Sequence, residues 1–285
     1  MNNKEATENL FNALFGKPGS RGDGKSWDEL VFTDRSPKML FRYVGWVDLM
    51  GASHMMSRSI DSASKSIGRL HEAVLKASFT LKLNTSVVLH PMADGVYVVA
   101  ETYEDVALVF AHVFRSYAQT FIKMNSESRF CPIRAAIAYG RVIDQNVYVR
   151  KLAAKTFKKR QEKLLTQYFS NVLHGKAYAT AHDAESKAPP FGIFQDESLR
   201  EFGMTKEKTH ITWPLEKWWC SGRSATEQQR TFAESFGQCL INHFNWVLEH
   251  PIDSGMDGKD AIDKIDGYKR SIREYFGLKN KEELQ

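Results

Sequence analysis

Two aspartates stand at positions where the residue pattern predicts that strands end. Asp48 closes an apolar and aromatic run that begins at Tyr43, and Asp94 lies between Ala93 and Gly95 in a short turn. Charged side chains are rarely buried unless they are paired or bind a metal. Two carboxylates brought together repel each other, and Mg²⁺, which prefers one or two carboxylates plus phosphate oxygens, would relieve that repulsion. The alternative is that Asp94 is an ordinary turn residue and Asp48 caps a helix.

A second motif, Gly19 to Ser26, fits the spacing G-x-x-x-x-G-K-S/T of loops that cradle phosphates. Such a loop needs a strand before it and a helix after it. The preceding residues, Phe15 to Pro18, do not make a buried strand, and the short stretch that follows is cut off at Ser36. The motif is therefore interpreted as a flexible basic loop, with a P-loop NTPase that uses Lys25 as the alternative.

The other residues that could do chemistry give weaker patterns. The nine histidines contain no H-E-x-x-H motif and the three cysteines contain no C-x-x-C motif, which argues against a structural zinc site. Cys131 and Cys239 stand in apolar patterns and are expected to be core thiols. The basic segment from Arg150 to Lys163 is either a solvated face or a surface that meets phosphates.

The elements that must position the two aspartates follow from periodicity. Strands are expected over 41–48 and 133–139, and a hairpin over 87–99, with its turn at 91–95. A long helix capped by Ser53 is expected to run to Phe79, with apolar residues recurring at helical spacing on one face: Met56, Ile60, Ala63, Ile67, Leu70 and Val74. A helix carrying Val106, Phe110, Val113, Tyr117 and Phe121 on one face, with Thr102 and Asp105 as its cap, completes the order β-α-β-β-α-β.

This order is the split βαβ pattern of a ferredoxin-like α+β core. In such a sheet the first strand lies beside the hairpin, so the order predicts that Asp48 and Asp94 come close together. Further elements are expected after the core: a helix over 175–186, strands over 191–194 and 209–212, a helix opened by a capping box of Ser224 and Glu227 and stopped by Pro251, and a last helix over 259–276.

Composition is consistent with a folded protein that binds an anion. The 285 residues are 42% hydrophobic and 26% charged, with 39 Lys and Arg against 34 Asp and Glu, for a net charge of +5. This mild excess suits a nucleoside triphosphate without demanding nucleic acid. Met1 to Phe15 do not resemble a signal peptide, and no apolar stretch is long enough to span a membrane. A cytoplasmic protein with reduced cysteines is expected.

The expected organisation has three parts. Residues 1–40 form an N-terminal lead with the flexible loop, residues 41–215 form the catalytic domain, and residues 216–285 form a helical extension packed on that core.

Four segments, in order, resemble the class III nucleotidyl cyclase family. Tyr43 to Gly51 is similar to its opening strand, Ala93 to Tyr97 to its hairpin, Ile133 to Gly140 to a later strand, and Gly175 to Glu185 to the start of a helix. The resemblance covers residues 40 to 200 approximately. Within this family the pattern is most similar to the pyrimidine cyclases of bacterial antiphage (Pycsar) systems, which make cyclic UMP or cyclic CMP to trigger an effector.

The resemblance implies a metal site and a homodimer. Asp48, Asp94 and the backbone carbonyl of Leu49 would carry two ions, Mn²⁺ or Mg²⁺, which activate the ribose 3′-hydroxyl and hold the triphosphate. Met50, Gly51 and Ala52, which lead into a helix, would bind phosphates. The active sites would lie between the two subunits of a homodimer.

The resemblance also implies a base pocket lined by Tyr43, Trp46, Val47 and His90, to which Trp46 and Val47 would contribute from the second subunit of the homodimer. His90 stands where adenylate cyclases carry the lysine that reads adenine. An aromatic side chain at Trp46 could stack on a base, although plain core packing is an equal alternative.

Three further family positions are also altered. Val172 replaces a base-reading aspartate, and Ala179 and Asp183 replace the asparagine and arginine that assist the transition state. The missing cation is therefore expected elsewhere, at Arg134 or Arg150. A purine cyclase, or a degenerate domain that binds a nucleotide without turnover, remains the alternative to a pyrimidine cyclase.

Overall fold

The computed structural model describes residues 39–81, 83, 87–123, 131–143, 173, 175–200, 215–220, 224–250 and 259–278, which apart from Met39 and Ile143 belong to one compact unit. Several sequence predictions lie outside this part of the chain. They concern the loop from Gly19 to Ser26, the basic segment from Arg150 to Lys163, Val172, and the strand expected over 209–212.

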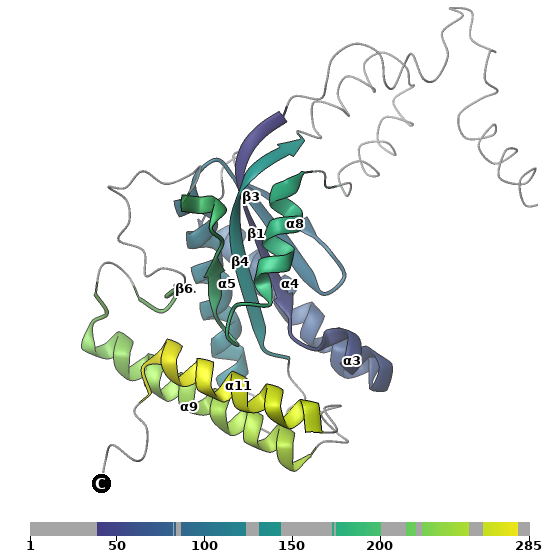
Figure 1. Cartoon of the computed structure of the whole chain (residues 1–285), viewed down its shortest axis with the longest axis vertical. Helices are drawn as coiled ribbons and strands as arrows, with labels where there is room; N and C mark the ends of the chain where they lie inside the picture. The colour runs from purple at the N-terminus through teal and green to yellow at the C-terminus, as the bar shows by residue number, and fades with distance from the viewer. Residues whose placement is uncertain are drawn as a thin grey trace, which may run out of the picture. The chain divides into compact units, whose positions relative to one another are not determined.

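A six-stranded sheet with the order β2-β3-β1-β4-β5-β6 forms the centre of the unit (Figure 1). Strand β3 is antiparallel to both β1 and β2, β5 is parallel to β4, and β6 is antiparallel to β5. The first four strands in the chain have the predicted split βαβ order, so the expected α+β class is confirmed. The strands are β1 (Met39–Leu49), β2 (Val88–Pro91), β3 (Gly95–Ala100), β4 (Ile133–Ile143), β5 (Ile193–Gln195) and β6 (Leu215–Glu216).

Helices cover both faces of this sheet. Helices α4 (Ile60–Leu81) and α5 (Tyr103–Lys123) pack on one face and α8 (Lys176–Glu185) on the other (Figure 1). The alternation of side chains along β1 explains this, because Val47 belongs to the core that includes α4 and α5, whereas Trp46 belongs to the cluster that includes α8. The cap of α5 is as predicted, since the Asp105 amide donates to the Thr102 hydroxyl over 3.2 Å.

The single helix expected from Ser53 to Phe79 is wrong. The chain forms α3 (Ala52–Arg58) and then α4, separated by Ser59 in an extended conformation. The hydroxyl of Ser59 accepts a hydrogen bond from the Ser62 amide over 3.3 Å, so Ser59 starts a new helix instead of continuing the old one. Ala63, Leu70 and Val74 are buried as predicted, whereas Ile60, the first residue after the break, is 75% exposed.

Two details of that prediction change with the break. The N-cap of α3 is Gly51, whose φ of 78° suits a glycine, and not Ser53. Met56, expected on the buried face, is 37% exposed.

Helices α9 (Glu227–Glu249) and α11 (Lys259–Phe276) lie side by side (Figure 1). The bounds of α11 are those predicted. The capping box of α9 is formed by Thr226 and Gln229, whose side chains and amides bond reciprocally, and not by Ser224 and Glu227. Both helices contribute to the same core as α4 and α5.

Phe191 links these helices to the rest of the core. It is fully buried, and its ring centroid lies 4.8 Å from that of Phe236 on α9 and 5.2 Å from that of Phe121 on α5. Its φ of 56° is uncommon for a residue other than glycine. The carbonyl of Phe191 accepts a 2.6 Å hydrogen bond from the Trp218 indole, which helps to hold that conformation.

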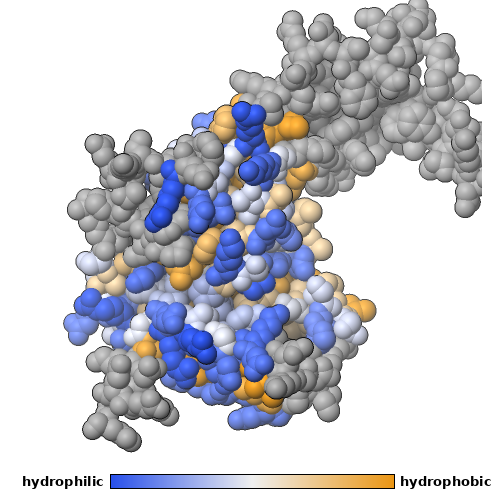
Figure 2. All heavy atoms as spheres, in the orientation of Figure 1, coloured by the Kyte–Doolittle hydropathy of each residue, from blue (hydrophilic) through white to orange (hydrophobic). Residues whose placement is uncertain are grey.

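The face drawn in Figure 2 is mostly hydrophilic over α9 and α11, with small scattered hydrophobic areas. Within the ranges given above, no helix combines the length and the apolar character needed to cross a membrane.

Candidate active site

The structure brings Asp48 and Asp94 to the same edge of the sheet, and we refer to them as the carboxylate pair. Asp48 lies opposite Gly95 in the β1–β3 register, one residue beyond Asp94. The amide of Leu49 donates to the backbone carbonyl of Asp94 over 3.2 Å, which ties the end of β1 to the hairpin turn. Both aspartates are half-buried. Strand pairing therefore places two carboxylates within one small region.

Arg134 and Glu185 add an ion pair beside the carboxylate pair. Arg134 comes from β4 and Glu185 from the last residue of α8, and the guanidinium donates to the carboxylate. Their side chains are only 18% and 8% exposed. Because Glu185 already holds Arg134, the guanidinium does not face the aspartates as an unpaired cation.

The surroundings of Asp48 raise its pKa to about 7. Burial is the main cause, and the negative charges of Glu185 and Asp94 add to it, while a hydrogen bond from Leu49 and the charge of Arg134 act in the opposite direction. Burial also raises the pKa of Glu185, against the effect of Arg134. The region therefore holds more negative charge than its own arginine compensates.

A divalent cation fits this excess of charge and these donors. The carboxylates of Asp48 and Asp94 and the carbonyl of Leu49 are oxygen ligands, which Mg²⁺ and Mn²⁺ prefer. Among the residues that the structure describes, no three His, Cys, Asp or Glu side chains are grouped so as to hold a metal ion. The pair would therefore bind a cation together with water or phosphate oxygens, in the way that Mg²⁺ commonly binds.

The segment predicted to bind phosphates is partly engaged in other bonds. The amide of Met50 donates to the carbonyl of Pro132 over 2.8 Å, and the carbonyl of Gly51 accepts from Met55 over 2.9 Å. The amides of Gly51 and Ala52 stand at the start of α3, where helical amides lack acceptors within the helix. Since α3 has seven residues, its dipole adds little.

The four residues expected to line a base pocket do not lie together within one chain. Tyr43 and Val47 face α4 and α5, and Val47 is fully buried there. Trp46 packs on the opposite face, and the ring of His90 lies 6.3 Å from that of Tyr178 on α8. The expectation ignored that neighbouring residues of a strand point to opposite faces of the sheet.

Trp46 instead belongs to an aromatic cluster with Tyr97, Tyr178 and His182. The Trp46 ring centroid lies 4.3 Å from that of Tyr97 and 5.7 Å from that of His182, and Tyr97 lies 5.3 Å from Tyr178. This cluster is on the face of β1 from which Asp48 also projects, because the two positions are two residues apart. Burial is the main cause that raises the pKa of Tyr97 to about 12, and Asp183 and Asp48 contribute.

Three residues of α8 that lie at or near the site were not predicted from the sequence. Tyr178, His182 and Glu185 are spaced by four and three residues, which puts them on one side of a helix. That spacing was the available signal. Ala179 and Asp183, which occupy the altered family positions, are on an exposed part of the same helix.

Cys131 is a core thiol, as predicted. It is buried, and burial raises its pKa to about 12, with a smaller contribution from the two aspartates. A thiol in that state is not a nucleophile.

No protein-family model and no curated protein matches the chain. Solved structures that match this chain include the guanylyl cyclase Cya2, at 13% identity and a TM-score of 0.39, covering 60% of this chain and 82% of that one. A bacterial light-regulated adenylyl cyclase matches at 10% identity and a TM-score of 0.42, covering 71% and 56%. An adenylate/guanylate cyclase/hydrolase from Silicibacter pomeroyi matches at 14% identity and a TM-score of 0.41, covering 63% and 95%.

Proposed function

We propose that this protein is a nucleotidyl cyclase that converts a pyrimidine nucleoside triphosphate, UTP in preference to CTP, into its 3′,5′-cyclic monophosphate and pyrophosphate. The observation that carries the proposal is the carboxylate pair, which strand pairing holds at one sheet edge with more negative charge than Arg134 compensates. The order of the four cyclase-like segments along the chain supports the same reaction.

The residues of the site have distinct tasks in this reaction. Asp48, Asp94 and the carbonyl of Leu49 would hold two Mg²⁺ or Mn²⁺ ions. When bound, such ions supply Lewis-acid stabilisation of a triphosphate. The amides of Gly51 and Ala52 orient phosphate oxygens at the start of α3. The ribose 3′-oxygen then forms a bond to the α-phosphorus, the bond from that phosphorus to pyrophosphate breaks, and the hydroxyl proton is released to solvent.

Arg134 is the described residue best placed to stabilise the developing charge. It is bound to Glu185, so a phosphate must compete with that carboxylate for the guanidinium. Arg150 is the second candidate from the sequence. Either arginine would replace the family arginine that is missing at Asp183.

The base preference rests on the altered positions. His90 stands where adenylate cyclases carry the adenine-reading lysine, and its partly exposed ring could stack on a base, whereas Trp46 is packed in the core. We propose a homodimer with its sites between subunits, so that the base contacts groups of both chains. As in the Pycsar systems that the sequence resembles, the cyclic nucleotide would serve as a signal in antiphage defence within the cytoplasm.

A nucleotide sensor without turnover is the second candidate. Ala179 and Asp183 offer no cation or amide to the transition state, and Arg134 is held by Glu185. A protein of this kind would bind a triphosphate with its carboxylate pair and release it unchanged.

Single-nucleotide assays with matched variants separate these proposals. Wild type, Asp48→Ala and Asp94→Ala would each be incubated with Mn²⁺ and one of UTP, CTP, ATP or GTP. A pyrimidine cyclase gives cyclic UMP or cyclic CMP with wild type and none with either variant. Full activity in either variant would refute the metal roles, and a purine product alone would refute the base preference. Triphosphate binding by calorimetry, without any product, would instead favour the sensor.

A further inference from the structure

The outward side of α4 carries large apolar side chains that are exposed in the part of the chain that the structure describes. Leu75 is 55% exposed, Phe79 is 79% exposed and Ile60 is 75% exposed. Gly68 lies on the same side of the helix as Leu75 and Phe79, and apart from the helix's own backbone nothing stands within 4 Å of the position that a Cβ would take there. We call this surface the α4 face. Large apolar groups gathered on one exposed surface commonly mark an interaction site.

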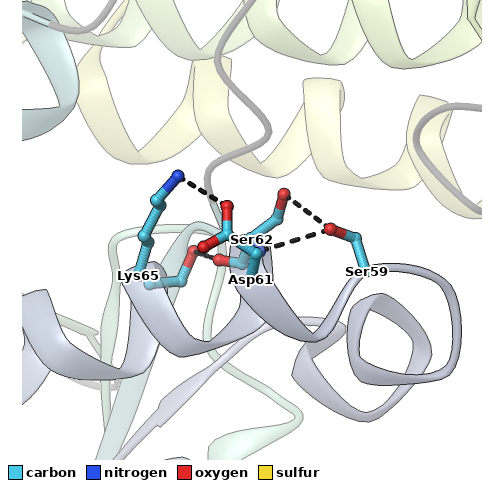
Figure 3. A network of polar contacts seen from close by, with 5 residues as sticks. Ser59, Asp61, Ser62 and Lys65 are labelled. Atoms are coloured by element: carbon cyan, nitrogen blue, oxygen red, sulfur yellow. Dashed lines mark hydrogen bonds and ion pairs between the residues drawn. The ribbon is translucent and has the colours of Figure 1, made fainter.

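Charged residues flank the α4 face in two ion pairs. Lys65 binds Asp61 over 2.6 Å, and Lys76 binds Glu72 over 2.6 Å. Figure 3 shows the first pair on the opening turns of α4, next to the hydrogen bond between Ser59 and Ser62. Along the helix the four charges therefore alternate as acid, base, acid and base.

This order of charges is complementary to itself when the helix is reversed. Asp61 and Lys76 are equally distant along the helix from the midpoint between Gly68 and Arg69, and Lys65 and Glu72 are also equally distant from it. If two copies of α4 cross antiparallel at that midpoint, Asp61 of each copy faces Lys76 of the other. Lys65 of each copy then faces Glu72 of the other, so all four charged contacts are attractive.

The exposed apolar residues lie within the same contact. Reversal places Leu75 of one copy beside Ser62 of the other, and Phe79 beyond Ile60 of the other. Gly68 lies at the crossing, where the lack of a side chain lets two backbones approach closely. One symmetric contact would thus bury the exposed apolar groups and extend both ion pairs into a network between chains.

We propose that the α4 face binds a second copy of this chain through an antiparallel, two-fold symmetric contact between the two α4 helices. This contact uses neither the carboxylate pair nor the aromatic cluster, so it does not depend on the proposed enzyme activity. If the chain also forms a dimer through its sites, two different symmetric contacts per chain produce a tetramer or an open chain of subunits.

Charge exchange within each ion pair provides the test. The first variant carries Asp61→Lys with Lys65→Asp, and the second carries Glu72→Lys with Lys76→Glu. Each variant keeps the net charge and an opposite-charge pair at i, i+4, so helix α4 is expected to persist. Each one, however, places like charges opposite each other at all four contacts between chains. When the two variants are mixed, the first variant faces the second with four attractive contacts again.

Sedimentation velocity over a range of concentrations gives the readout for the full-length chain. Wild type is expected to show a concentration-dependent association that each variant alone weakens about tenfold or more, because four exposed pairs change from attraction to repulsion. An equimolar mixture of the two variants should regain the association. Circular dichroism of each variant checks that the helices are retained.

Cross-linking gives a second readout that does not depend on charge. Gly68→Cys should form a disulfide between chains under mild oxidation, whereas Gly267→Cys, at a similarly open helical glycine on α11, serves as the control. The proposal is overturned if mixing the variants restores nothing, or if Gly68→Cys cross-links no faster than the control. Wild type that stays unassociated through this face would likewise overturn it and would leave the face to a different partner.

Discussion

Replacing Asp48 by asparagine is expected to stabilise the folded protein above neutral pH. The folded protein raises the pKa of Asp48 from its ordinary 3.8 to about 7, mainly through burial and then through Glu185 and Asp94. A rise of roughly three pH units corresponds to about 4 kcal/mol of unfavourable free energy when the carboxylate is charged. Asparagine has the same shape without the charge, and its oxygen can still accept the hydrogen bond from Leu49.

The sign of this effect depends on pH. Because the folded state binds the proton more tightly than the unfolded state, the cost is present in full above pH 7 and disappears as the pH falls toward 4. Allowing for relaxation of the neighbouring groups, Asp48→Asn is expected to gain about 1–3 kcal/mol at pH 8 and almost nothing at pH 4.5. In a chain of this size such a gain raises the melting temperature by roughly 3–9 °C.

Thermal unfolding in EDTA at the two pH values measures this difference directly. Each value is compared with wild type at the same pH, so that other titrating groups cancel. Asp183→Asn is the matched control, because Asp183 is an exposed carboxylate on α8. A variant that is less stable than wild type at pH 8, or that gains equally at both pH values, would refute the view that Asp48 is an uncompensated buried charge.

Three other changes test neighbouring parts of the account. Gly95→Ala forces a Cβ into the Trp46 ring beside the carboxylate pair, and should cost about 1–3 kcal/mol in urea unfolding; an unchanged midpoint would show that the ring moves aside. His243 is buried and its pKa is lowered to about 4, so stability should fall from pH 6.5 to 4, and His243→Leu should flatten that fall in unfolding curves. Arg134→Gln leaves Glu185 without its ion-pair partner and should lower the free energy of unfolding by roughly 3–5 kcal/mol at pH 8. The loss should be smaller at pH 5, because burial raises the pKa of Glu185 and the carboxyl group takes up a proton. An equal loss of stability at both pH values would contradict this.

Local patterns in the sequence were sufficient for most of the fold. The hairpin, the cap at Thr102 and the bounds of α11 follow from turn residues, capping chemistry and helical periodicity within a few neighbouring positions. Given those elements, the split βαβ order fixes which strands are neighbours, and this brings Asp48 beside the hairpin turn.

Features that depend on competition between equivalent residues were not predictable in the same way. Ser53 and Ser59 are both residue types that cap helices, and Ser224 and Thr226 both precede α9. Residue type alone therefore does not show which member of each pair is the cap. The capping box at Thr226 is decided by a glutamine three residues later that bonds back to it.

Contacts between distant segments were also missed. Arg134 and Glu185 are 51 residues apart, and their pairing depends on how α8 packs over β4. The four residues of the expected base pocket do not share one face of the sheet, because strand alternation sends Val47 and Trp46 to opposite faces.

The central claim is that the carboxylate pair supports cyclisation of a pyrimidine nucleotide. Mass spectrometry of the products formed from an equimolar mixture of UTP, CTP, ATP and GTP with Mn²⁺ tests it most directly, with Asp94→Asn as the parallel sample. We predict cyclic UMP as the main product, followed by cyclic CMP, and no cyclic product from Asp94→Asn. Cyclic AMP or cyclic GMP alone, no cyclic product from wild type, or an equal yield from Asp94→Asn would contradict it.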